Sequence, residues 1–330
     1  MSENVNKKDL ELLEALQTGY SEILNEVNKI IVGQENIIRN LIISLLSKGH
    51  CLLIGVPGLA KTLLISTIAK VMDLKFSRIQ FTPDLMPSDI TGTEILEEDK
   101  TTGKKIFRFI KGPVFSNIVL ADEINRTPPK TQAALLQAMQ EHEISIAGQT
   151  FPLDEPFFVL ATQNPIEQEG TYPLPEAQLD RFMFSLFINY PSKEEEIEIV
   201  NSTTTGTEPS LNKIITKNDI LELQHLVRRI PVSDNVVNFA VDLARKTRPD
   251  KNESSSFVND FISWGAGPRA SQYLILGAKV VAALNGRVTP DIEDVKLVAK
   301  PVLRHRIVIN FNAEAEGITA TDIINKLLST

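Results

Sequence analysis

The segment Gly55-Val-Pro-Gly-Leu-Ala-Lys61-Thr62 constrains the fold of this chain more than any other feature of its sequence. It follows Cys51-Leu-Leu-Ile-Gly55, a short apolar run that predicts a strand buried on both faces. Helical periodicity begins at Thr62 and continues to Met72. A glycine-rich loop between a buried strand and a helix can turn its backbone N–H groups around phosphate oxygens. We therefore predict a phosphate-binding loop at this position.

The residues of this loop have expected roles in holding a nucleotide. Lys61 would reach the β- and γ-phosphates, and the Thr62 hydroxyl would hold Mg²⁺. Ala60 stands where the general pattern has glycine; because alanine starts a helix readily, we expect this departure to cost little. The alternative is a glycine-rich strand-to-helix turn with an exposed lysine. The predicted nucleotide-binding residues are Gly55, Val56, Pro57, Gly58, Leu59, Ala60, Lys61, Thr62 and Leu63.

A second apolar run, Asn117-Ile-Val-Leu-Ala-Asp122-Glu123, ends in two acids. At the carboxyl end of a neighbouring parallel strand, Asp122 would lie beside the bound phosphates and hold Mg²⁺ or its water. Glu123 would then orient and deprotonate the attacking water. The alternative is an acidic strand end that caps the next helix. The phosphate loop upstream favours the catalytic interpretation.

Short apolar runs alternate with helical stretches through the first 190 residues, which predicts an α/β fold with a parallel sheet. The predicted strands are residues 51–55, 76–80, 117–121, 157–161 and 184–188. Two further segments alternate weakly around polar, glycine-containing turns and predict inserted hairpins. They are residues 94–109, with the turn at 101–104, and residues 144–153, with the turn at 147–149.

Strand signals stop after Tyr190-Pro191, and the remaining chain has helical patterns separated by polar loops. We therefore place a domain boundary near Pro191, with an α/β domain at residues 1–190 and a smaller helical domain at residues 191–330. In the second domain, Thr289 and Pro290 predict a helix that starts at the proline with the threonine as its N-cap.

The balance of 34 basic and 42 acidic residues gives a net charge of −8, which disfavours nucleic acid as a partner. Cys51 is the single cysteine, so an intrachain disulfide is excluded, and the four histidines lack partners at metal-ligand spacing. No apolar run reaches the ~18 residues of a membrane span. The polar segment Met1–Asp9 has no signal-peptide pattern. These features predict a cytoplasmic protein without a membrane span.

Several motifs follow one another in the order and spacing of a known family. They are the 55–62 loop, Asp122-Glu-Ile-Asn-Arg126, Ala161-Thr-Gln-Asn164-Pro, Leu179-Asp-Arg181-Phe and Gly267-Pro-Arg269-Ala. Through them the chain resembles the MoxR-type AAA+ ATPases from about residue 31 to residue 307. The resemblance implies a P-loop αβα core with a five-stranded parallel sheet, followed by a smaller all-helical lid, with ATP and Mg²⁺ at their junction. The predicted hairpins match the helix-2 insert and the pre-sensor-1 hairpin of this clade.

The resemblance also implies roles for two residues that follow predicted strands or loops. Asn164 would be sensor 1, which positions water against the γ-phosphate; a turn-forming asparagine before Pro165 is the alternative. Arg181 would be an arginine finger that reaches the γ-phosphate of a neighbouring subunit. Its alternative is a surface arginine that bridges Asp180 or Glu176.

Three weaker assignments complete the implied site. Arg269, at the start of a lid helix, would be sensor 2, and the alternative is an ordinary helix-terminal arginine. Val32 and Gly33 resemble the segment that lies against adenine, although the glycine is equally consistent with a plain turn. Arg126 either faces a subunit interface or makes a structural ion pair.

The activity implied by the resemblance is Mg²⁺-dependent ATP hydrolysis coupled to chaperone-like remodelling or assembly of protein partners. It implies a homo-oligomeric ring, a hexamer, whose clients include proteins with von Willebrand A domains. A magnesium-chelatase-like metal-insertion subunit and a nucleic-acid motor are the alternatives, and the acidic balance opposes the second. A nucleotide-dependent scaffold without hydrolysis is opposed by the intact Glu123.

Overall fold

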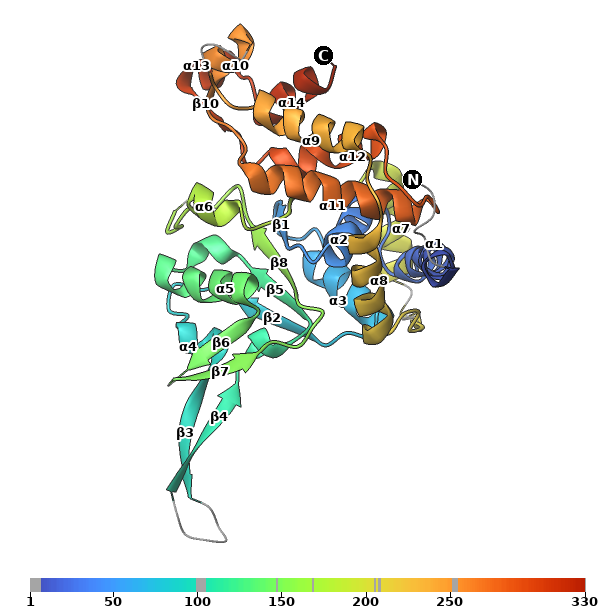
Figure 1. The fold of residues 1–330 in the computed structure, drawn as a ribbon. Helices are drawn as coiled ribbons and strands as arrows, with labels where there is room; N and C mark the ends of the chain where they lie inside the picture. The colour runs from blue at the N-terminus through green and yellow to red at the C-terminus, as the bar shows by residue number, and fades with distance from the viewer. Residues whose placement is uncertain are drawn as a thin grey trace.

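Five parallel strands form the central sheet of the computed structural model, as the sequence predicts (Figure 1). The model describes residues 7–98, 105–146, 148–167, 169–204, 206, 209–250 and 255–329. The sheet order is β2-β5-β8-β1-β9. The strands are β1 (Cys51–Ile54), β2 (Phe76–Gln80), β5 (Ile118–Asp122), β8 (Phe158–Gln163) and β9 (Phe184–Phe187).

The sheet order brings the carboxyl ends of β5, β8 and β1 side by side. Ala121 on β5 pairs with Ala161 on β8, and Gln163 at the end of β8 pairs with Ile54 at the end of β1. Since ligands of such sheets bind at the carboxyl ends of the strands, the loops after these three strands define one edge of the molecule as the place for a site.

Alternating side chains of the sheet contribute to two separate cores. Leu53 and Leu160 belong to a core shared with α1 (Lys7–Val27), α2 (Glu35–Leu46) and α3 (Lys61–Val71). Leu52 and Ala161 belong to the core on the other face, which includes α4 (Pro87–Thr91) and α5 (Pro129–Glu141). Two short 3₁₀ turns, η1 (Pro113–Phe115) and η2 (Ile124–Arg126), flank β5. The result is an αβα sandwich.

Both predicted hairpins are present. The first pairs β3 (Gly92–Glu98) with β4 (Lys105–Lys111) and extends away from the sheet (Figure 1). The second pairs β6 (Glu143–Ile146) with β7 (Gln149–Pro152). The turn predicted at residues 101–104 and residue 147 of the second turn lie outside the described residues.

The chain beyond β9 is helical, as predicted, with one addition. A two-stranded antiparallel ribbon of β10 (Ile262–Trp264) and β11 (Val308–Ile309) lies within it, which the sequence patterns did not predict. Helix α11 (Pro268–Leu284) packs against α12 (Ile292–Leu303), α9 (Asp234–Lys246) and α8 (Lys217–Arg229) and also against α1 and α2. The remaining helices, with α6 before β9, are α6 (Glu176–Leu179), α7 (Lys193–Thr203), α10 (Ser256–Phe261), α13 (Phe311–Glu316) and α14 (Ala320–Ser329).

The predicted start of α12 is wrong by two residues. Asp291, not Thr289, is the N-cap, because its carboxylate accepts the N–H of Asp294 and the Asp294 carboxylate accepts the N–H of Asp291 in return. Thr289 instead donates its hydroxyl to the carbonyl of Pro231 at 3.1 Å. Within the described ranges, no helix is both long enough and apolar enough to cross a bilayer.

Candidate active site

The predicted phosphate-binding loop lies between β1 and α3. Gly55 is required where the loop leaves the sheet, since a Cβ there would lie 2.2 Å from Ile188 Cγ2. Gly58 has a φ of +85°, in the region that favours glycine. Lys61 starts α3 and donates to the carbonyl of Gly55 at 2.5 Å, so its ammonium group lies over the loop. The loop thus lies between a strand and a helix, and phosphate binding by the loop and Lys61 stays a prediction.

Burial and neighbouring carboxylates act in opposite directions on the pKa of Lys61. Burial lowers the pKa of its ammonium group below the ordinary value, and the carboxylates of Asp122 and Glu123 raise it in opposition. Only β8 separates β5 from β1 in the sheet, so Asp122 at the end of β5 and Glu123 directly after it lie at the same edge as the loop that follows β1. The fold therefore brings Lys61 together with Asp122 and Glu123, which lie 61 and 62 residues further along the chain.

The reason for expecting Ala60 to cost little, that alanine starts a helix readily, is wrong. Ala60 has a φ of +53° and is the residue before the first turn of α3, so it lies in the left-handed region and not in the helix. The helical propensity of alanine is therefore irrelevant at this position. A residue with a Cβ is strained in this conformation by about 1 kcal/mol relative to glycine.

Thr162, for which the sequence predicts no role, makes hydrogen bonds to both Asp122 and Glu123. Its hydroxyl donates to Asp122 Oδ1 at 2.6 Å and accepts the N–H of Glu123 at 2.9 Å. Thr162 is fully buried on β8, and Glu123 has a φ of +59°. A buried threonine at the end of an apolar strand was the available signal. The hydroxyl stabilises an unusual backbone conformation directly at the two acids.

Three further side chains contact Asp122 and Glu123. Arg78 on β2 donates to Asp122 Oδ2 from Nη2 at 2.6 Å, and Gln80 on the same strand donates to Glu123 Oε2 at 3.0 Å. Arg126 also donates to Glu123 Oε2 at 3.0 Å, so in this structure it makes the ion pair that was one of its two interpretations. Polar neighbours therefore hold both acids in place.

The residues predicted to hold a metal offer oxygen atoms only. Mg²⁺ binds oxygen ligands and keeps several of its waters, so the Thr62 hydroxyl and the Asp122 carboxylate fit this ion. Asp122 Oδ2 already accepts two hydrogen bonds from Arg78, whereas Oδ1 accepts one, from Thr162, and can accept a second interaction. The donor set is therefore compatible with Mg²⁺ beside the phosphate loop.

Asn164 lies one residue beyond β8 and is buried. Its Oδ1 accepts the N–H of Ile166 at 3.1 Å, which is the local turn that the alternative interpretation required. The position beside the ends of β1 and β5 is also the one expected of sensor 1. The turn is observed, and the sensing role stays a prediction.

Arg181 and Arg269 both contact residues of this same chain. Arg181 Nη1 donates to the carbonyl of Leu136 on α5 at 2.8 Å, and its partner is neither Asp180 nor Glu176. Arg269, in the first turn of α11, pairs with Asp180 Oδ2 at 3.2 Å. The structure thus places Arg181 on the α5 side of the core. The ion pair of Arg269 with Asp180 connects Arg269 to the residue that precedes Arg181.

Gly33 forms a tight turn before α2. Gly33 and Gln34 have φ values of +68° and +61°, and a Cβ on Gly33 would lie 2.1 Å from Glu195 Oε1 of α7. The plain-turn interpretation therefore explains this glycine, and contact of Val32 and Gly33 with adenine stays a prediction.

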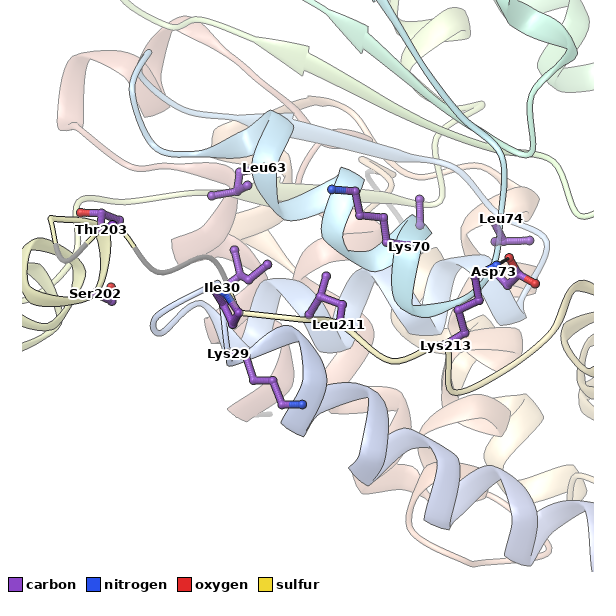
Figure 2. Close-up of a pocket in the computed structure, with 13 residues that line it drawn as sticks. Lys29, Ile30, Leu63, Lys70, Asp73, Leu74, Ser202, Thr203, Leu211 and Lys213 are labelled. Atoms are coloured by element: carbon purple, nitrogen blue, oxygen red, sulfur yellow. Dashed lines mark ion pairs between the residues drawn. The ribbon is translucent and has the colours of Figure 1, made fainter.

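A pocket of about 850 Å³ runs along α3. Figure 2 shows Leu63 near the start of the helix, Lys70 along it and Leu74 beyond its end, with Leu211 from the segment before α8 opposite. Leu63 is the one predicted nucleotide-binding residue among its described lining residues. The pocket therefore borders the phosphate loop at one end only.

The fold and this set of residues define a P-loop ATPase of the AAA+ class. A family model described as "ATPase family associated with various cellular activities (AAA)" matches residues 50–184, and an AAA lid domain matches residues 255–327. Chaperone MoxR1 of Mycobacterium tuberculosis is 46% identical over 305 residues, which cover 92% of this chain and 80% of that protein. The chain belongs to the MoxR family of AAA+ ATPases.

Two other relatives agree with this assignment. YeaC of Bacillus subtilis, an uncharacterized protein, is 42% identical over 93% of this chain and 92% of its own length. A crystal structure from Cytophaga hutchinsonii, of a candidate ATPase, has 45% identity and a TM-score of 0.90, and the match covers 97% of this chain and 96% of that one.

Proposed function

We propose that this chain hydrolyses ATP with Mg²⁺ and that hydrolysis drives chaperone-like remodelling or assembly of a protein client. The observation that carries the proposal is the placement of Asp122 and Glu123 by Thr162 at the end of β5, beside Lys61. A scaffold that only bound nucleotide would need the loop but not a fixed second acid. The name of the relative Chaperone MoxR1 supports the client-directed part of the proposal.

The residues divide the work of phosphoryl transfer among them. Lys61 and the loop N–H groups bind the phosphates, while Thr62 and Asp122 hold Mg²⁺, which would neutralise charge on the β- and γ-oxygens. Gln80 and Arg126 each donate one hydrogen bond to the same oxygen of Glu123, Oε2. We therefore assign Oε1 to accepting the proton of the attacking water.

Of the three remaining proposed roles, only that of Arg181 requires an assembled ring. Asn164 positions the water, Arg269 reads the γ-phosphate from the helical part, and Arg181 acts on the nucleotide of a neighbouring subunit. We propose a hexameric ring with a client that bears a von Willebrand A domain, in the cytoplasm, and a domain boundary near Pro191. Arg181 supports the ring because its side chain lies against α5 and not over its own phosphate loop.

The test separates nucleotide binding from turnover. Glu123→Gln should keep ATP affinity and lose hydrolysis, because an amide cannot take the proton of the water, and Lys61→Ala should lose affinity itself. Glu167→Gln is the matched control, since it removes the same charge from the other carboxylate that pairs with Arg126. Turnover by Glu123→Gln at the rate of the Glu167→Gln control would contradict the proposal.

A further inference from the structure

Arg306, just after α12, is a buried arginine whose donors all have partners. Its side chain is 2% exposed. Nε donates to Asp180 Oδ1 at 2.7 Å, and Nη2 donates to the carbonyls of Asp180 and Phe182 at 2.9 and 2.7 Å. Nη1 donates to the carbonyl of Met183 at 3.2 Å and to that of Val302. All five N–H groups of the guanidinium are used.

Four of these five hydrogen bonds end on residues 180–183, the segment that contains Arg181. Tyr273 of α11 adds a fifth contact, from its hydroxyl to the carbonyl of Arg181 at 3.4 Å, and the Arg306 guanidinium lies 5.3 Å from the centre of its ring. The backbone on both sides of Arg181 is therefore fixed by side chains from the helical C-terminal part.

Asp180 connects this arrangement to Arg269. Its Oδ1 accepts from Arg306 and its Oδ2 accepts from Arg269, so one carboxylate balances two guanidinium groups. A phosphate that attracted Arg269 would leave Asp180 to Arg306 alone. If Arg269 responds to the subunit's own nucleotide, Asp180 would link that response to the segment that contains Arg181.

We propose that Arg306 is a positioning residue that holds Arg181 in the position from which it acts on the neighbouring subunit's nucleotide. Asp180, which accepts hydrogen bonds from both Arg306 and Arg269, connects these two arginines. This proposal rests on the proposed function, because it needs hydrolysis that depends on Arg181 across an interface. A planar guanidinium is required, since a lysine ammonium cannot reproduce the fork of donors that reaches four acceptors on one segment.

The test is a subunit-mixing experiment with Arg306→Lys, which keeps the positive charge of the side chain and loses the planar guanidinium with its set of N–H donors. Alone, this variant should bind ATP within about twofold of wild type and show a kcat lowered about 10²-fold, the effect of displacing a reacting group by an ångström. Mixed with Glu123→Gln subunits, it should regain activity, because its intact site then meets an intact Arg181. Asp180→Asn should behave in the same way and serves if Arg306→Lys does not fold.

Two controls distinguish this effect from general damage. Arg304→Lys makes the same change two residues away, at a side chain that contacts Phe187 and the carbonyl of Lys300, and should leave kcat unchanged. Lys61→Ala mixed with Glu123→Gln should stay inactive, since both lack a working site. If Arg181→Ala is restored by mixing and the folded Arg306 and Asp180 variants are not, the positioning role is overturned while the proposed function stands. If wild type shows no hydrolysis, the proposed function itself fails.

Discussion

Thr162 donates its hydroxyl to Asp122 at 2.6 Å across two neighbouring strands, although the residues are 40 positions apart in the chain. The threonine is fully buried, so a missing hydroxyl could not be replaced by bulk water. The pair therefore ties the geometry of the acidic strand end to the packing of the sheet.

Thr162→Val should lower ATP turnover by roughly 10- to 100-fold, the range for removing a partner that orients a metal ligand. The free energy of unfolding should also fall by about 1–3 kcal/mol, because the N–H of Glu123 loses its acceptor. Steady-state kinetics and urea unfolding measure the two effects. Thr162→Ser keeps the hydroxyl and should retain most of the turnover; equal rates for the two variants would show that the hydroxyl is not needed.

Ala60→Gly should raise the free energy of unfolding by roughly 0.5–1 kcal/mol, since glycine adopts a φ of +53° without strain. Ala133→Gly is the matched control, because Ala133 is exposed within α5 and the same change should there destabilise by about 1 kcal/mol. Urea unfolding of both variants gives the comparison. A decrease for Ala60→Gly would mean that the loop relaxes around alanine at no cost.

Stability should fall as the pH is lowered from 7 toward 4. Burial lowers the pKa of His50 from 6.5 to about 4, so between these values the unfolded chain binds a proton that the folded chain does not. His50 alone contributes about 3 kcal/mol to this loss. In the folded chain its ring accepts the N–H of Val159 at 3.1 Å and contacts the carbonyl of Met139 at 3.2 Å.

The contribution of His50 can be isolated by substitution. His50→Gln should flatten the dependence of unfolding free energy on pH between 6.5 and 4, whereas His225→Gln, at an exposed histidine of α8, should leave it unchanged. Chemical unfolding at a series of pH values makes the comparison. Parallel curves for wild type and His50→Gln would show that another group carries the acid sensitivity.

The sequence predicts those parts of the fold and site that depend on local patterns. The five strands have apolar runs of their own; Asp122 and Glu123 directly follow one of these runs, and Lys61 follows another after the glycine-rich loop. The parts of the fold and site that depend on tertiary contacts are not predicted by these patterns. Arg306 donates hydrogen bonds to backbone carbonyls more than 120 residues away, and backbone acceptors leave no trace in the pattern of side chains.

Local conformation was the other source of error. Ala60 was assigned by its helical propensity, but its φ is set by the turn that leads from β1 into α3. The start of α12 was assigned to Thr289 and Pro290, but the reciprocal hydrogen bonds of Asp291 and Asp294 form a stronger cap two residues later. Thr162 could have been found, because a polar residue at the end of an otherwise apolar central strand requires a partner.

We propose that each active site of the ring is built from two neighbouring subunits, and mixing Arg181→Ala subunits with Glu123→Gln subunits tests this claim. Each variant alone should bind ATP and hydrolyse it at least about 10³-fold more slowly than wild type, the scale for losing an arginine finger or a catalytic base. Mixed rings should regain activity wherever an intact Glu123 meets an intact Arg181 from the next subunit, and wild-type specific activity should rise with protein concentration as rings assemble. A mixture that stays inactive although the subunits co-assemble, with wild-type activity independent of concentration, would contradict the claim.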